Sequence, residues 1–555
     1  MRIGLDVGGT HTDAVLISRE GIVSSAKVQT DHNDLLNSIL QALGDILRNA
    51  DARQIEAVTL STTLTTNALL EGKADRVGVI VSSGPGIDAV AHRIGDAYHV
   101  IDGSIDHRGE ERRPLDIKQL GDAIADCRRL GIRSYAVATK FSVRNPAHEL
   151  LMESCIGADS DVITAGHRIS GSLNFPRRIT TAYFNSAVRL RYNEFTAAVW
   201  NGISELGLIA PVNILKADGG TMPLDASRLM PFQSILSGPA ASIMGASALC
   251  RVDRDAVLLD IGGTSTDIAV LAAGVPLIER EGISLNGRPT LVRSLETLSI
   301  AIGGDSALRI VDGKVTVGPD RLGPCMAAGG STPALLDALN VAGEAAYGDV
   351  EASRLGMSRL SEKAGKHAGA IANEAIDLAV LTITSAIRSL TEEVNARPVY
   401  TIHELLHAGR IDPARLIIIG GPADAFAKAL SHSLGVEAIV PGRHGIANAI
   451  GAALTRTTME IELFADTQRE VLLVPALSMQ ERISRGYSLD NAKLDAEKYL
   501  LMSAGAADPG DVQTIEASAF NMIQGGRLVG KNIRVRSQLK PGLVPEYTGS
   551  AGFRC

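Results

Sequence analysis

Two segments of the 555-residue chain repeat the same aspartate, glycine and threonine residues in the same order. Residues 3–17 read IGLDVGGTHTDAVLI, and residues 257–271 read VLLDIGGTSTDIAVL. The six aspartate, glycine and threonine positions are identical at an offset of 254 residues, from residue 3 to residue 257: Asp6/Asp260, Gly8/Gly262, Gly9/Gly263, Thr10/Thr264, Thr12/Thr266 and Asp13/Asp267. Each copy is an apolar run, a Gly-Gly turn and a second apolar run, a pattern that predicts a β-hairpin.

Residues of these types, in this order, are suited to binding a phosphorylated ligand. A Gly-Gly turn lets the backbone approach a phosphate without a Cβ atom in the way, and successive N–H groups form an anion-binding nest. Asp6 and Asp260, each at the end of a strand, are suited to holding Mg²⁺, which binds one or two carboxylates together with phosphate oxygens. Two such turns would close on a polyphosphate from both sides. Asp13 and Asp267 would either share in this site or cap the turns.

The segments after each hairpin predict alternating helices and strands. Helical spacing of apolar residues predicts helices over 35–47 and 117–130, and short apolar runs predict strands over 55–60, 77–82 and 134–139. In the second half, the expected elements are a long helix over 369–395, a strand at 415–419, the triplet Gly420-Gly421-Pro422 and a helix over 423–434. A strand, a glycine pair and a helix in this order place N–H groups where a nucleotide can bind.

The repeat predicts an α/β protein with two similar lobes around a nucleotide cleft, because its offset is far longer than the unit of a solenoid. From about residue 460 the pattern changes to short apolar strands, a polar helix and a turn-rich basic tail, which we interpret as a small C-terminal appendage. A Rossmann dehydrogenase is the alternative fold. It would need G-x-G-x-x-G after the first strand, where this chain has D-V-G-G-T.

The composition disfavours several classes of partner and location. The net charge is −8, so a basic footprint for nucleic acid or an anionic membrane is missing. Aromatic residues make up only 3%, which disfavours base stacking, whereas glycine is abundant at 56 residues. We expect no signal peptide and no membrane-spanning segment, since charge interrupts the apolar runs. Five scattered cysteines without C-x-x-C spacing predict unpaired thiols, no zinc site and a cytoplasmic location.

The two hairpins and the strand-Gly-Gly-helix segment resemble the phosphate and adenosine motifs of the actin-like ATPase superfamily, which includes acetate and sugar kinases, Hsp70 and actin. The matching sequences are LDVGGTHTD, LLDIGGTSTD and LIIIGGPADA, and GIANAIGAAL (445–454) resembles the helix that connects the lobes. Further segments narrow the resemblance to the hydantoinase/oxoprolinase A family: STTLTTNALLEGK (61–73), KFSVRNPAHE (140–149), KADGGT (216–221), ILSGPAASIMGA (235–246), IAIGGDS (300–306) and VGPDRLGP (317–324).

This resemblance covers about residues 1–455 and implies two lobes of ribonuclease-H-like topology. The implied division is an N-terminal lobe over 1–183, a second lobe with the adenosine motif over 184–458, and a small α+β region over 459–555. The chain departs from the family pattern at three places, where GAGGGS becomes AIGGDS, an ADPGPACYG-type run becomes RLGPCMAAG, and GGAGP becomes GGPAD. These departures leave the substrate open.

The resemblance implies an enzyme that hydrolyses a cyclic amide, such as a hydantoin or a 5-oxoproline-like lactam, with ATP and Mg²⁺ through a phosphorylated carbonyl. Whether a hydantoinase B-type partner subunit is needed stays open. The alternatives are a small-molecule kinase and a nucleotide-switch or reactivating ATPase.

The same resemblance assigns roles to individual residues. The expected catalytic residues are Asp6, Asp13, Asp218, Asp260 and Asp267, with Mg²⁺ on Asp6 and Asp260. ATP is expected to contact Gly8, Gly9, Thr10, Thr12, Gly262, Gly263, Thr264, Thr266, Gly303, Gly304, Gly420 and Gly421. The substrate is expected to contact Thr62, Thr63, Asn67 and Ser237. His403 and His407, four residues apart on an expected helix, share a face suited to a metal but have no third ligand nearby in the sequence.

Overall fold

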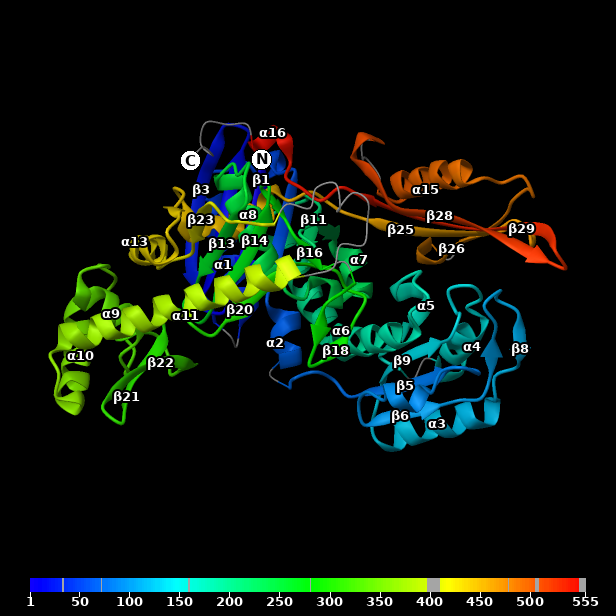
Figure 1. Cartoon of the computed structure of the whole chain (residues 1–555), viewed down its shortest axis with the longest axis horizontal. Coiled ribbons are helices and arrows are strands. Elements are labelled where there is room, and N and C mark those ends of the chain that lie inside the picture. The colour runs from blue at the N-terminus through cyan, green and yellow to red at the C-terminus, as the bar shows by residue number, and fades with distance from the viewer. Residues whose placement is uncertain are drawn as a thin grey trace.

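The computed structural model describes residues 1–31, 34–70, 72–157, 160–279, 281–396, 410–477, 479–504 and 509–548. Figure 1 shows two central sheets, a smaller sheet with its own helices beside the first lobe, and a C-terminal sheet that extends to one side. The sequence therefore folds into several α/β layers, as the alternating pattern predicts.

The first central sheet has the strand order β12-β11-β4-β1-β2-β3. Its strands are β1 (Arg2–Val7), β2 (His11–Ser18), β3 (Gly21–Gln29), β4 (Ala57–Thr62), β11 (Val212–Leu215) and β12 (Thr221–Pro223). β1 runs antiparallel to β2 and parallel to β4, and β4 runs parallel to β11. Helices α1 (Leu35–Leu47) and α6 (Phe175–Glu205) pack on this sheet through Ile39, Leu43, Val199 and Ile203.

The second central sheet repeats this topology. Its order is β15-β14-β13-β23-β24, with β20 paired to β14. The strands are β13 (Ala256–Ile261), β14 (Thr266–Ala272), β15 (Val275–Pro276), β20 (Thr297–Ile300), β23 (Arg415–Ile419) and β24 (Glu437–Ile439). In both sheets an antiparallel hairpin is followed by a parallel strand on the other side of its first strand, which is the ribonuclease-H-like order.

Helices cover the second sheet and extend it. They are α9 (Leu335–Ala342), α10 (Val350–Ala364), α11 (Ala368–Ala396) and α13 (Ala423–Leu434), and a hairpin of β21 (Ser306–Val311) and β22 (Lys314–Arg321) lies beside them. By length and composition α11 could cross a membrane, with a mean hydropathy of 1.5 in its most apolar window. Half of that window is buried, and Ile371, Ala375 and Ile383 belong to the core of the lobe.

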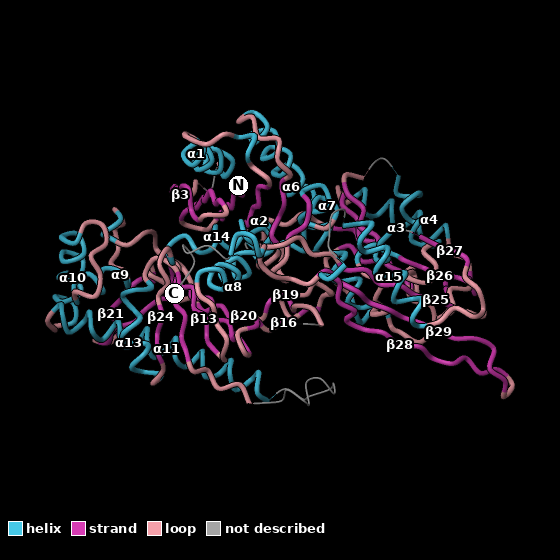
Figure 2. The backbone as a smooth tube through the Cα atoms, turned by 90° about the horizontal axis from the view of Figure 1, so that it is seen from above, coloured by secondary structure: helices cyan, strands magenta, loops and turns pink. Residues whose placement is uncertain are grey.

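Two helices lie between the central sheets, as Figure 2 shows. They are α8 (Ser237–Leu249) and α14 (Ala447–Leu454). Glycine permits their close approach: a Cβ on Gly245 would lie 2.0 Å from Ala447 O, and one on Gly451 would lie 2.2 Å from Ala241 O. A Cβ on Gly4 in β1 would lie 1.9 Å from Ala449 O. Part of the glycine excess therefore serves helix packing rather than ligand binding.

A parallel sheet of order β10-β9-β5-β6 forms the outer part of the first lobe. It contains β5 (Val77–Ser82), β6 (Ala97–Val100), β9 (Ser134–Thr139) and β10 (Val162–Ala165), with helices α3 (Ile117–Arg129), α4 (Ala147–Ile156) and α5 (Gly166–Ile169). The shorter elements are α2 (Leu64–Leu70), β7 (Ser104–Ile105), β8 (Glu111–Arg113), α7 (Leu224–Leu229), β16 (Ile278–Glu279), β17 (Ser284–Leu285), β18 (Arg288–Pro289) and β19 (Ser294–Leu295). Helix α6 spans residue 183, and the domain boundaries implied by the resemblance stay predictions.

The C-terminal region is a five-stranded antiparallel sheet of order β27-β26-β25-β29-β28. Its elements are β25 (Glu460–Asp466), β26 (Val471–Val474), β27 (Met479–Arg482), α15 (Leu489–Ala504), β28 (Val512–Gln524) and β29 (Arg527–Leu539), followed by α16 (Pro545–Thr548). The expectation of a turn-rich tail is wrong, because β28 and β29 form a long hairpin that projects from the body (Figure 1). Much of β28 is exposed, so it lacks the apolar alternation that marks a strand.

The expectation of five unpaired cysteines is also wrong. Cys127, Cys155 and Cys325 are free thiols, whereas Cys250 is disulfide-bonded. Pairing depends on distance in the folded chain, which the spacing of cysteines along the sequence does not reveal.

Candidate active site

The two repeated segments form hairpins with the same turn. The Gly8 N–H donates to His11 O at 3.0 Å, and the Gly262 N–H donates to Ser265 O at 2.9 Å. In each hairpin the two aspartates are directly opposed across the strands, Asp6 with Asp13 and Asp260 with Asp267. The hairpins predicted from the repeat are therefore present, with equivalent residues in equivalent positions.

The two turns face each other, because Thr10 of the first turn approaches Gly263 of the second. A Cβ on Gly263 would lie 3.3 Å from Thr10 Oγ1. Of the other repeated threonines, Thr12 is buried and bonds to the Thr30 hydroxyl at 3.0 Å, and Thr266 donates to Ile302 O at 2.7 Å. Thr12 and Thr266 thus brace the turns from behind, whereas Thr10 and Thr264 lie on the turns themselves.

The other two glycine pairs pack around the second turn. Gly304 N–H donates to Gly262 O at 2.9 Å, and a Cβ on Gly303 would lie 2.6 Å from Gly263 O. Gly420, with φ of +96°, fits beside β13, because a Cβ there would lie 2.2 Å from Ile261 O and 2.7 Å from Asp260 Oδ1. Three glycine pairs distant in sequence therefore meet at one place.

Open space lies next to these packed glycines. A Cβ on Gly9 or on Gly421 would meet no atom within 4 Å, even though both residues belong to the converging motifs. Backbone that is packed on one side and open on the other can approach a phosphate or an adenosine closely. This cradle fits the nucleotide that the sequence predicts.

Carboxylates gather at the base of the cradle. Burial, together with the nearby Asp13 and Asp260, raises the pKa of Asp6 to about 7. Burial and Asp260 likewise raise the pKa of Asp267 to about 7. Mutual repulsion of this kind is what a bound cation would relieve.

The surroundings of Asp260 and Asp13 differ from those of Asp6 and Asp267. Asp260 Oδ2 accepts hydrogen bonds from Ser242 Oγ at 2.5 Å and from Asn448 Nδ2 at 3.1 Å. Asp13 Oδ1 lies 2.9 Å from Lys27 Nζ, although burial still raises the pKa of Asp13. Ser242 and Asn448 come from α8 and α14, so the helices between the lobes also hold a candidate metal ligand.

The carboxylate oxygens fit Mg²⁺ by their chemistry, since hard cations prefer oxygen ligands. Among the described residues, no group of three or more His, Cys, Asp or Glu side chains is arranged to hold a metal by itself. Mg²⁺ usually keeps several waters and binds phosphate oxygens, so one or two carboxylates suffice. Asp6 and Asp260 would hold such an ion. His403 and His407, the other candidate metal ligands, lie outside the described residues.

Three of the expected substrate residues lie at the end of β4 or just after it, next to the first hairpin, and the fourth, Ser237, begins α8. Thr62 pairs in register with Val7, and Ser237 Oγ both donates to Thr62 O at 3.0 Å and accepts from Thr62 N–H at 3.3 Å. Both side chains are buried. Thr63 Oγ1 donates to Val7 O at 3.4 Å and accepts from Asn67 Nδ2 at 3.4 Å. Ser237 and Thr62 thus link the first lobe to α8, and Thr63 and Asn67 are the less buried pair.

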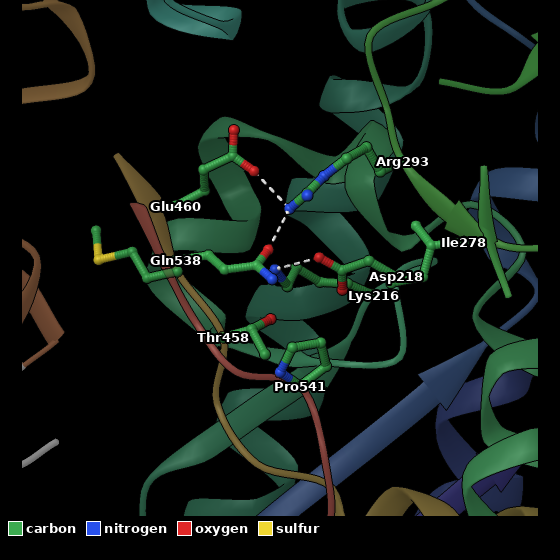
Figure 3. A pocket seen from close by; sticks show the side chains of 9 residues that line it. Lys216, Asp218, Ile278, Arg293, Thr458, Glu460, Gln538 and Pro541 are labelled. Atoms are coloured by element: carbon green, nitrogen blue, oxygen red, sulfur yellow. Dashed lines mark hydrogen bonds and ion pairs between the residues drawn. The ribbon is translucent and has the colours of Figure 1, made fainter. Parts of the chain in front are cut away.

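Asp218 lies in a separate pocket, shown in Figure 3. It follows β11, two strands from β1 at the same end of the parallel strands, which corresponds to about 10 Å. Lys216 Nζ lies 3.1 Å from Asp218 Oδ2, and Gly220 N–H donates to Oδ1 at 3.0 Å. Burial alone would raise the pKa of Asp218, but Lys216 and Arg293 outweigh it and hold the pKa below its ordinary value.

The rest of this pocket comes from residues that the sequence did not single out. Arg293 pairs with Glu460 and donates to Gln538 Oε1 at 3.0 Å, and the buried Thr458 Oγ1 has no hydrogen-bond partner. Glu460 and Gln538 belong to the C-terminal sheet, so the pocket lies where that sheet meets the loop after β11 of the first central sheet. No local motif could have revealed these residues, because more than 230 positions separate Asp218 from Thr458 and Gln538.

Two sheets of the same ribonuclease-H-like topology, with paired hairpins at a shared cradle, define an actin-like ATPase fold. The chain belongs to the hydantoinase/oxoprolinase family. The family model described as Hydantoinase/oxoprolinase matches residues 178–461, and the Hydantoinase/oxoprolinase N-terminal region matches residues 2–158.

Individual relatives are more distant. The chain is 27% identical over 481 residues to caprolactamase subunit alpha of Pseudomonas jessenii, an alignment that covers 79% of this chain and 68% of that one. It is 25% identical to 5-oxoprolinase 1 of Arabidopsis thaliana, covering 72% of this chain but 36% of the longer relative. A nucleotide-free acetone carboxylase structure, solved in a study of ATP-dependent acetone carboxylation, matches with a TM-score of 0.72 and 16% identity, over 98% of this chain and 88% of that one.

Proposed function

We propose that this protein uses ATP to open a cyclic amide, such as a lactam or a hydantoin. The observation that carries the proposal is the convergence of two aspartate-bearing hairpins and the Gly420-Gly421 turn on one cradle, in a chain of the hydantoinase/oxoprolinase family. Two relatives are named for lactam rings, a caprolactamase subunit and a 5-oxoprolinase, which supports this class of substrate.

In the proposed reaction ATP activates a bond that water attacks slowly. Amide resonance makes the carbonyl carbon a poor electrophile, and transfer of the γ-phosphate to the carbonyl oxygen, with loss of ADP, removes that resonance. One water then adds to the carbon and the ring C–N bond breaks, which leaves an acyl phosphate and the freed nitrogen. A second water hydrolyses the acyl phosphate, so the products are phosphate and the open-chain amino acid, or the N-carbamoyl amino acid from a hydantoin. The protein contributes mainly positioning and charge stabilisation.

The residues divide this work. Asp6 and Asp260 hold Mg²⁺, which neutralises phosphate charge when it is bound. The N–H groups of the Gly8-Gly9 and Gly262-Gly263 turns hold the phosphates, with the Thr10 and Thr264 hydroxyls as added donors. Gly303-Gly304 supports the second turn, and Gly420-Gly421 leaves room for the adenosine.

The substrate would lie between this cradle and the Asp218 pocket. Thr63 and Asn67 are the best placed of the expected substrate residues, since they are only partly buried. A lowered pKa makes Asp218 a weak base. We therefore assign Asp218 to binding and orienting the substrate, and not to taking its proton.

The test is ADP release from the full chain with ATP, Mg²⁺ and a panel of lactams and hydantoins, alone and with a B-type partner subunit. We expect at least one ring to stimulate ADP release, with phosphate and an open-chain product in equal amounts. Stable phosphorylated product in the phosphorus NMR spectrum would instead indicate a kinase. Release that is indifferent to every ring, with and without the partner, would contradict the proposal.

Variants separate the substrate site from the ATP site in this assay. Asp218→Asn should raise the KM for the ring while leaving the KM for ATP within about threefold. Asp225→Asn is the matched control, because this carboxylate is exposed and forms only a surface ion pair with Arg228. Equal behaviour of the two variants would contradict the role of Asp218.

A further inference from the structure

An additional ion pair lies against the second phosphate turn. Asp305 N–H donates to Gly263 O at 2.6 Å, and Asp305 Oδ1 accepts from Cys325 N–H at 3.0 Å. Arg321 Nη2 lies 3.3 Å from Asp305 Oδ2. Both residues lie in segments where this chain departs from the family pattern, Asp305 in AIGGDS and Arg321 in RLGPCMAAG.

The Asp305 carboxylate borders the phosphate cradle. A Cβ on Gly263 would lie 2.8 Å from Asp305 Oδ2 and 3.3 Å from Thr10 Oγ1, so this oxygen lies beside the point where the two turns face each other. The charges of Asp305 and Arg321 also act on His11 in the first hairpin, together with Lys27, although burial is the main cause of its lowered pKa. The Asp305–Arg321 pair is therefore close to both hairpins.

Arg321 is positioned to reach the cradle. It ends β22, where it pairs in register with Ser306, directly after Asp305. Its side chain is 31% exposed, whereas that of Asp305 is 9% exposed, so the guanidinium borders solvent while the carboxylate is fixed. The two distances of 3.3 and 2.8 Å place Arg321 Nη2 no more than 6.1 Å from the Cβ position of Gly263. A rotation of the long arginine side chain covers that distance.

The charge balance of the cradle favours the use of this arginine. Asp6, Asp13, Asp260, Asp267 and Asp305 supply five carboxylates, and among the described residues their ion pairs come from Lys27 and Arg321. Lys27 is held between Asp13 and Gly445 O. Triphosphate in such an acidic place needs a cation besides Mg²⁺, and a guanidinium matches phosphate geometry with two parallel hydrogen bonds.

We propose that Arg321 is a phosphate-binding residue that contacts the terminal phosphate of ATP, and that Asp305 is a positioning residue that holds Arg321 beside the second turn. The proposal rests on the proposed use of ATP and adds to it a residue that distinguishes ATP from ADP. Asp305 also weakens ATP binding, because its negative charge repels the phosphate that Arg321 attracts.

The test measures affinity of the full chain, with Mg²⁺, for ADP and for a non-hydrolysable ATP analogue by titration calorimetry. Arg321→Ala should weaken binding of the analogue about 10- to 100-fold, as expected for the loss of a hydrogen bond to a charged group. It should weaken binding of ADP by less than about threefold. Arg321→Lys should recover part of the loss, because it keeps the charge. Asp305→Asn keeps an oxygen for the Cys325 N–H and removes the repulsion, so it should tighten the analogue about threefold or more.

The matched control is Arg309→Ala, which removes the Arg309–Asp320 ion pair on the same β21–β22 hairpin, at an exposed position. It should change neither affinity. If the ion pair were purely structural, removing either partner would change the affinity for the analogue in the same direction. Weaker binding in Arg321→Ala together with tighter binding in Asp305→Asn would therefore exclude a purely structural role.

Three results would overturn the inference. Equal losses for ADP and the analogue in Arg321→Ala would show that the arginine does not contact the terminal phosphate. Weaker analogue binding in Asp305→Asn that disappears without Mg²⁺ would make Asp305 a metal ligand. If the wild type binds both nucleotides and the variants bind them equally well, only this inference fails. If the wild type binds neither nucleotide, the proposed function is contradicted as well.

Discussion

The two phosphate hairpins share the same six aspartate, glycine and threonine residues and the same turn hydrogen bond, but their surroundings differ. In the first hairpin Lys27 neutralises Asp13, and a Cβ on Gly9 would meet nothing within 4 Å. In the second, residues 303–305 close on the turn, and no ion pair joins Asp267 to a cation within the described ranges. The shared motif sets the geometry of strands and turn, whereas the neighbouring loops give each turn its electrostatics.

Replacing the first-strand aspartate of each hairpin should give the largest effects. Asp6→Asn should lower ATP turnover about 1,000-fold, because a lost metal ligand removes several kcal/mol of charge stabilisation. It should not destabilise the fold, since an ionised carboxylate is unfavourable where burial raises the pKa to about 7. Thermal unfolding and ADP release, measured on the same preparation, test both statements.

Asp260→Asn distinguishes the two hairpins. Turnover should fall to a similar extent, but stability should also fall, by about 1–2 kcal/mol, because Ser242 and Asn448 lose a charged acceptor. Equal melting temperatures for Asp6→Asn and Asp260→Asn would contradict the asymmetry between the hairpins.

Glycine replacement in the turns should give intermediate effects. Gly263→Ala should lower the free energy of unfolding by about 1–3 kcal/mol, because its Cβ would lie 2.8 Å from Asp305 Oδ2. The Asp305 carboxylate cannot easily move away, since the Cys325 N–H and Arg321 hold it in place. Gly9→Ala should leave the melting temperature unchanged and raise the KM for ATP, if the open space beside Gly9 belongs to the nucleotide. Lower stability with normal ATP binding in Gly9→Ala would reverse this interpretation.

The sequence predicted what depends on short segments. The hairpins, the helices over 35–47 and 423–434 and the strand at 415–419 agree with the structure to within a few residues, because each has a local apolar pattern. The surroundings that distinguish the hairpins come from Lys27, Ser242, Asp305 and Asn448, brought in from four separate elements or loops. The Asp218 pocket escaped prediction for the same reason, since its other wall comes from the C-terminal sheet.

Titration of the buried aspartates, present in both hairpins, should give a smaller effect. The pKa of Asp267 is raised to about 7 by burial and Asp260, whereas an unfolded aspartate titrates near about 4. Between these values the native protein binds more protons than the unfolded chain, so the free energy of unfolding falls as the pH rises. Asp6 contributes in the same direction.

Asp267→Asn should remove part of this loss of stability with rising pH. The difference in melting temperature between about pH 5 and pH 7.5 should shrink by roughly 2–4 °C. Asp225→Asn, at an exposed position, should keep the wild-type difference. A wild-type protein that gains stability as the pH rises through this range would contradict the raised pKa values.

Removing the Lys27 ammonium group, which pairs with Asp13 in the first hairpin, should have the smallest effect. Lys27→Ala removes the ion pair of Asp13. The first hairpin then resembles the second, in which no ion pair joins Asp267 to a cation within the described ranges. Because the Lys27 side chain is 44% exposed, stability should change by no more than about 1 kcal/mol, and turnover by less than about threefold. Asp13→Asn added to Lys27→Ala should recover what is lost, since it removes the unpaired charge. A loss of turnover above tenfold that this second substitution does not recover would mean that Lys27 acts on the phosphates directly, and that the first hairpin has its own counterpart of Arg321.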